Sequence, residues 1–187
     1  MQILQKLATK LVVFVFAVFA VASAFALGQE LIKSATLQTL ANPDISVEQA
    51  LLVAEGAIDA CKKDNSIISV AVVDRDGSVR FLIRGDGATP ELADNARRKA
   101  YTARTFRQAT STWMERTALD AVDDKGKAID LNGQRYLENT IAEKGGMPII
   151  WHGDAIGGVG VTGSKGGGEA DEACAKAGVA AIADQLL

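Results

Sequence analysis

The chain has 187 residues, of which 48% are hydrophobic, and its 20 basic and 23 acidic side chains give a formal net charge of −3. An acidic chain lacks the positive surface that a general nucleic-acid-binding protein needs, so we expect no nucleic-acid partner. The length suits one domain with a sizeable core.

Residues 1–26 have the pattern of a secretory signal peptide. Two lysines precede an apolar core at residues 11–20, and small residues place A-x-A cleavage sites at Ala24 and Ala26. The competing interpretation is a retained anchor helix, because the apolar stretch is near the lower limit for spanning a bilayer. We expect cleavage near Ala26 and a periplasmic or secreted product, which keeps 18 basic and 23 acidic side chains.

Residues 27–45 have only a weak pattern and are expected to form a leader before a domain at residues 46–187. The domain starts with a predicted helix. Ser46 and Gln49 form a capping box at its beginning, and apolar residues recur at helical spacing through about Lys63.

A predicted hairpin and two further helices follow. The β-rich runs 67–74 and 78–84 are joined by a short turn that contains Asp-Gly, which is typical of a hairpin. Pro90 opens the next helix, which runs through Phe106, and a short helix is expected near Ser111.

The C-terminal part repeats the pattern of hairpin and helix. Residues 120–146 are polar and read as loops, whereas 147–151 and 155–162 read as strands around a tight turn. The last helix is expected to begin near Glu169. Strand pairs joined by tight turns predict an antiparallel sheet with helices against it, an α+β fold.

The second strand of that hairpin contains the letters G-x-G-x-x-G at Gly158, Gly160 and Gly163. In a dinucleotide-binding fold this motif follows a strand, and an acidic residue about 20 positions later contacts the ribose. Here the glycines lie inside the strand, and the acid at that offset, Asp184, lies near the end of the chain. We therefore interpret them as strand glycines that permit close packing.

The two cysteines, Cys61 and Cys174, both lie on predicted helices. An oxidising compartment permits a disulfide between them, worth on the order of 4 kcal/mol for so long a loop. The alternative is two buried thiols that pack as small apolar groups.

The sequence contains few residues that suit conventional catalysis. The only histidine is His152, so a Ser-His-Asp triad would have to use it, and no G-x-S-x-G motif is present. Histidine and cysteine together number three, which is too few for a typical zinc site. We expect binding rather than catalysis.

Four stretches occur in a characteristic order: SVAVVDRDG at 69–77, RGDGATP at 84–90, ARRKAYTA at 96–103, and GGVGVTG at 157–163 followed by DEACAKAG. Together they resemble the GlcG/HbpS haem-binding family, which includes the C-terminal domain of PduO-type proteins. The resemblance covers nearly the whole predicted mature chain. It implies a profilin-like α+β domain with an antiparallel sheet of about five strands flanked by helices, assembled as a homo-oligomer.

The resemblance also implies a function. It suggests an extracytoplasmic binding protein for haem, a related tetrapyrrole or another small anionic ligand, with a role in haem handling or redox sensing. The alternatives are an enzyme that degrades haem or acts on a small 2-hydroxy acid such as glycolate, and a sensory partner of a membrane protein.

Haem requires cations or donors for its propionates and a ligand for its iron. The helix at 95–108 is rich in arginine, which binds carboxylates in a bidentate manner. Hydroxyl groups on and after it are weaker candidates, and the glycine tract before the last helix offers backbone amides and a lysine to an anion. The candidates are Arg97, Arg98, Lys99, Tyr101, Thr102, Arg104, Thr105, Thr110, Lys165, Gly166 and Gly167.

The iron ligand is expected to be Tyr101, as a phenolate, or His152. Some family members carry a histidine just after the proline of RGDGATP, where this chain has Glu91, which argues against a histidine ligand there. The alternative interpretations remain open: the arginines form a solvated helix face, Tyr101 belongs to the core, and the glycine tract is a plain connection.

Overall fold

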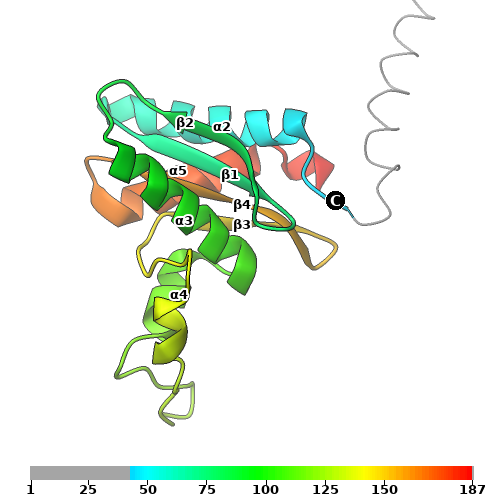
Figure 1. Ribbon diagram of the computed structural model, residues 1–187. Helices are drawn as coiled ribbons and strands as arrows, with labels where there is room; N and C mark the ends of the chain where they lie inside the picture. The colour runs from blue at the N-terminus through cyan, green and yellow to red at the C-terminus, as the bar shows by residue number, and fades with distance from the viewer. Residues whose placement is uncertain (1–42, 187) are drawn as a thin grey trace, which may run out of the picture. The chain divides into compact units, whose positions relative to one another are not determined.

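The computed structural model describes residues 43–186, so the predicted signal peptide and most of the predicted leader lie outside the described residues. The helices and strands follow the predicted order (Figure 1). They are α2 (Val47–Cys61), β1 (Ser69–Asp74), β2 (Val79–Arg84), α3 (Pro90–Phe106), α4 (Thr110–Arg116), β3 (Gly146–Trp151), β4 (Asp154–Thr162) and α5 (Gly167–Ala180), with short 3₁₀ helices at Lys62–Asp64, Asn132–Tyr136 and Ala183–Gln185.

The described strands form one antiparallel sheet in the order β2-β1-β4-β3. Helix α3 covers one face, and α2 and α5 cover the other (Figure 1). The expected α+β fold is confirmed. Residues 43–186 hold four strands rather than about five, and β2 and β3 form the two edges of the sheet in this part of the chain.

The glycines of β4 bring α3 unusually close to the sheet. A Cβ atom on Gly158 would lie 2.9 Å from the Cβ of Arg104, and one on Gly160 would lie 2.6 Å from the amide nitrogen of Ala100. Alanines line the facing side of α3, so helix backbone packs directly on strand backbone. The interpretation of these glycines as packing positions is confirmed, and no dinucleotide turn is formed.

The main core lies on the opposite face, where alternate valines of β1 and β4 point toward α2 and α5. A disulfide joins Cys61 at the end of α2 to Cys174 in α5, with Cα atoms 5.7 Å apart. The predicted bond is thus present, and it fixes two helices that pack side by side.

Short-range signals predicted the helix starts well. The Ser46 hydroxyl accepts a hydrogen bond from the backbone of Gln49, whose side chain accepts one from the Ser46 backbone. Thr89 caps α3, and Pro90 is its first residue. Helix α5 begins at Gly167, two residues before the predicted start, and no side chain caps it.

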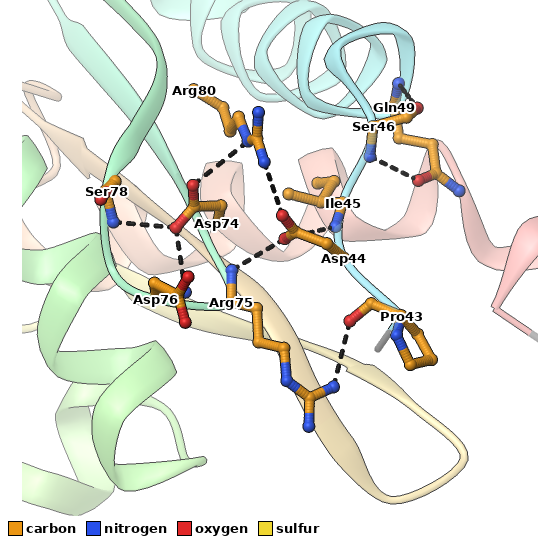
Figure 2. A network of polar contacts seen from close by, with 10 residues as sticks. All are labelled: Pro43, Asp44, Ile45, Ser46, Gln49, Asp74, Arg75, Asp76, Ser78 and Arg80. Carbon is orange, nitrogen blue, oxygen red and sulfur yellow. Dashed lines mark hydrogen bonds and ion pairs between the residues drawn. The ribbon is translucent and has the colours of Figure 1, made fainter. Parts of the chain in front are cut away.

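A polar network ties the segment before α2 to the β1–β2 hairpin (Figure 2). The Asp44 carboxylate accepts hydrogen bonds from the backbone amides of Ile45 and Arg75. The guanidinium of Arg80 bridges Asp44 at 2.6 Å and Asp74 at 3.2 Å. The hydrogen bond to Asp44, offset in part by desolvation, raises the pKa of Arg80 above its ordinary value. These contacts include residues 43–45 in the folded unit, although the sequence places them in the leader.

Candidate functional site

Three segments meet at the end of the sheet that holds the turns of both hairpins, which we call the turn end. Arg75 in the β1–β2 turn lies 3.9 Å from the carboxylate of Asp154, which follows the β3–β4 turn. Arg107, immediately after α3, donates to the same carboxylate at 3.2 Å and to the carbonyl of Gly153. The turn end therefore combines two arginines with the C-terminal end of α3.

Both predicted iron ligands lie at this end. The ring of Tyr101 lies on the β1–β2 turn, since a Cβ atom on Gly77 would be 2.7 Å from its Cε2 atom. His152 is exposed in the β3–β4 turn, with a φ of 46°, and its ring makes an edge contact with Trp151. The structure thus brings Tyr101 and His152 to the same side of the domain from distant parts of the sequence.

The junction of α3 and α4 holds buried donors that lack acceptors. Phe106 and Trp113 stack with ring centroids 3.4 Å apart. Within residues 43–186, Arg104 Nε, Thr105 Oγ1 and Trp113 Nε1 are buried and have no hydrogen-bond partner. Unsatisfied buried donors cost free energy, and in folded proteins they are usually met by water or a ligand. Each of these three atoms can donate a hydrogen bond to an acceptor such as a water molecule or a carboxylate oxygen.

Three other candidates hold a loop instead of pointing to the turn end. They all contact the segment 139–141: Arg97 donates to the side chain of its first residue, Arg98 to the carbonyl of its second, and Thr102 accepts from the amide of its third. These contacts give the three side chains structural roles within the fold.

Lys99 and Thr110 are also engaged inside the protein. The buried Lys99 ammonium donates to the carbonyl of Val161 at 3.2 Å and to Asp171 at 3.1 Å. The Thr110 hydroxyl accepts a hydrogen bond of 2.8 Å from the amide of Gly146, at the start of β3. The cationic side chains of α3 therefore point to different neighbours and do not form one continuous cationic face.

The glycine tract lies at the opposite end of β4 from the turn end, and several of its amides already have acceptors. Ser164 donates to Asp171 at 2.9 Å, Lys165 donates to Ser66 at 3.0 Å, and Gly167 donates to the Ser164 carbonyl. The anion cradle expected here stays a prediction.

Two surface pockets lie apart from these candidates. One of about 340 Å³ is formed by the segment after α4, and one of about 520 Å³ lies between α4, α5 and β3. Lys144 and Glu169 form an ion pair of 2.7 Å at the larger pocket, and their hydrogen bond raises the pKa of Lys144 and lowers that of Glu169. None of the predicted haem or anion residues lines either pocket.

Residues 43–186 offer neither a conventional metal centre nor a membrane span. This part of the chain contains no group of three or more His, Cys, Asp or Glu side chains placed to hold a metal ion. None of its helices has the length and hydropathy required to cross a membrane.

Comparison with known proteins identifies the family. A family model described as "Haem degrading protein HbpS-like" matches residues 45–180. The chain belongs to the HbpS-like family. No match was found among curated proteins.

Solved structures of HbpS resemble the chain over most of its length. A double mutant of HbpS from Streptomyces reticuli is 33% identical, with a TM-score of 0.67 over 78% of this chain and 91% of that one. A second HbpS structure is 32% identical, with a TM-score of 0.68 over 78% and 94%. The protein ORFY of Klebsiella pneumoniae, at 23% identity and a TM-score of 0.63 over 78% of this chain and 95% of that one, shares the fold.

The contacts that assemble the turn end were not visible in the sequence of this HbpS-like protein. Arg75 reads as an ordinary turn residue, and Asp154 follows it by about 80 positions. Only the pairing of β1 with β4, which sets Asp74 opposite Gly157, brings the two turns together.

Proposed function

We propose that this HbpS-like protein binds haem at the turn end of its sheet, in an extracytoplasmic compartment. The observation that carries the proposal is the match of residues 45–180 to a family whose description names haem. The identity of 33% to HbpS over most of both chains supports the same assignment.

The residues at the turn end suit haem. Arg107 at the turn end and Arg104, about one helical turn earlier on α3, are cations for the propionates. Tyr101 and His152 are the two side chains that can ligate the iron. Bound haem would supply redox chemistry and a strong visible absorbance, while the protein holds and orients it.

Haem degradation is the second candidate, because the family description names that activity. The turn end supplies cations and donors that can fix the orientation of a propionate-bearing substrate. We rank binding first, since the residues there include no recognisable catalytic set.

Export of the protein is part of the proposal. The disulfide between Cys61 and Cys174 supports an oxidising compartment, and the pattern of residues 1–26 supports secretion. Mass spectrometry of the N-terminus, on protein from the periplasmic fraction or medium, should find a chain that starts after Ala26 or Ala24. A chain that starts at Met1 in the cytoplasm would contradict export.

The binding experiment is a titration of the purified mature protein with hemin, followed at the Soret band. We expect a shifted, saturable band that is lost in Tyr101→Phe and retained in His152→Ala. Tyr136→Phe is the matched control, because Tyr136 is exposed on the segment after α4, away from the turn end. Loss in His152→Ala alone would assign the iron to the imidazole.

Absence of any spectral change in the folded wild-type protein would overturn haem binding. Addition of a reductant in air to the hemin complex then tests degradation. Progressive loss of the Soret band together with release of iron, above the rate of free hemin with albumin, would support it. A stable band under the same conditions would leave binding as the function.

A further inference from the structure

The carboxylate of Asp154 lies between two guanidinium groups that come from distant parts of the chain. Its Oδ1 atom accepts a hydrogen bond of 3.2 Å from Arg107, which follows α3, and its Oδ2 atom lies 3.9 Å from the guanidinium of Arg75 in the β1–β2 turn. Among the ion pairs formed within residues 43–186, no other carboxylate is paired with either arginine. Two positive charges therefore share one negative charge, and the group as a whole is cationic.

Both guanidinium groups are held in place by a backbone carbonyl. Arg75 donates to the carbonyl of Pro43 at 3.0 Å (Figure 2), and Arg107 donates to the carbonyl of Gly153. These bonds fix the direction of each arginine without neutralising its charge. A guanidinium has five N–H donors, so each of the two arginines retains donors for a carboxylate. The turn end thus already has an arranged position for a carboxylate, and Asp154 occupies part of it.

The two arginines hold Asp154 weakly. Its side chain is 57% exposed and that of Arg107 is 52% exposed, so water competes with this ion pair and salt screens it. The separation of 3.9 Å from Arg75 is too long for a hydrogen bond. A carboxylate that binds an arginine through both of its oxygens makes two parallel hydrogen bonds, which are stronger than either contact of Asp154. A ligand that binds in this way can displace Asp154.

We infer that Asp154 is an internal competitor at the turn end, whose place on Arg107 and Arg75 is taken by a carboxylate of the ligand. The inference rests on the proposed function and specifies its ligand chemistry: the ligand bears carboxylates, either the propionates of haem or those of a small free acid. Asp154 lowers the affinity for such a ligand. Its displacement also loosens the contact between the end of α3 and the β3–β4 turn, which carries His152.

The first test compares hemin titrations of the wild type and of Asp154→Asn, which removes the charge of the side chain and keeps its shape. We expect the variant to bind hemin about three- to tenfold more tightly, the scale of a solvent-exposed ion pair. The matched control is Asp94→Asn, which should bind hemin like the wild type. Asp94 is 54% exposed and is paired with Arg97 at 2.9 Å, so this variant makes the same change of charge on another arginine.

The source of the gain is tested by removing either partner of the new contact. In an Arg107→Gln background, Asp154→Asn should no longer strengthen hemin binding, because the donor that it releases is absent. With hemin dimethyl ester, whose propionates carry no charge, the gain should also disappear. A gain that persists in Arg107→Gln, or an equal gain in Asp94→Asn, would overturn the inference and leave haem binding itself in place.

The second test does not depend on haem. Succinate is added to isotope-labelled protein at constant ionic strength, and NMR follows the side-chain Nε–H signals of Arg75 and Arg107. We expect both signals to shift with saturation, at an about three- to tenfold lower succinate concentration in Asp154→Asn than in the wild type. The signal of Arg84, which donates to the carbonyl of Ala88, is the control and should not shift.

The two tests separate this inference from the proposed function. A shift with succinate in a protein that gives no Soret change with hemin would contradict haem binding and support Asp154 as a competitor of a free acid. A gain with hemin but no shift with succinate would assign the displacing carboxylate to the propionates. An equal response of Asp154→Asn and the wild type to both hemin and succinate would refute the inference.

Discussion

Lys99 in α3 and Asp171 in α5 form an ion pair of 3.1 Å, although the two helices lie on opposite faces of the sheet. The pair is formed where β4 ends, and both side chains are buried. Asp171 also accepts the amide of Ser164, and Lys99 also donates to the carbonyl of Val161. One pair of charges therefore connects both helical layers to the end of the central strand.

Replacement of Lys99 by methionine should lower the free energy of unfolding by about 3–5 kcal/mol, because it leaves the Asp171 carboxylate buried without its cation. Urea unfolding followed by circular dichroism measures this change. A double variant, Lys99→Met with Asp171→Leu, should recover part of the loss. Lys144→Met removes an exposed ion pair and should have little effect; an effect as large as that of Lys99→Met would contradict the special role of burial.

Gly160→Ala should destabilise the protein by about 1–3 kcal/mol or prevent folding, because the new methyl group would meet the backbone of α3. The control is Gly133→Ala, where a Cβ atom meets nothing within 4 Å. Both variants are compared by their denaturation midpoints. Equal midpoints would show that α3 can move away from β4 at little cost.

Removal of the disulfide by Cys61→Ala with Cys174→Ala should lower the free energy of unfolding by about 2–4 kcal/mol, through the greater freedom of the unfolded chain. Non-reducing peptide mapping of the wild type should find the two cysteines in one linked peptide pair. Two free thiols in exported wild-type protein would contradict the bond.

The Glu169 carboxyl should titrate below its ordinary pKa, because Lys144 donates a hydrogen bond to it and supplies a positive charge. A depressed pKa in the folded state stabilises the protein at neutral pH, and this stabilisation disappears as the pH falls through the folded pKa. Carbon-detected NMR titration of wild type and Lys144→Met measures the shift. The variant should return the pKa of Glu169 toward its ordinary value, and an unchanged pKa would rule out Lys144 as the cause.

The sequence predicted the order of helices and strands because the signals are local. Ser46 and Gln49, Thr89 and Pro90, and the turns at 75–77 and 152–153 each act over a few residues. The close approach of α3 to β4 was also predictable, since a glycine inside an apolar strand leaves the space of a side chain open to a neighbouring backbone.

The arrangement of the candidate site was less predictable. Helix α3 lies on the sheet with one face, so side chains one or two positions apart point to different neighbours. Arg97 and Arg98 therefore reach the segment 139–141, Lys99 enters the interior, and Tyr101 and Arg107 approach the turn end. These outcomes depend on the register of the helix against the sheet, which the composition of the helix does not determine.

The contact between α3 and β4 has a mechanical consequence. With glycine at 158 and 160, no layer of side chains lies between the two backbones that could deform and absorb a displacement. Helix α3 and strand β4 therefore move together as one rigid unit. A displacement of α3 near Arg104 would therefore also displace Lys99, which lies at the far end of β4 and is paired with Asp171 of α5.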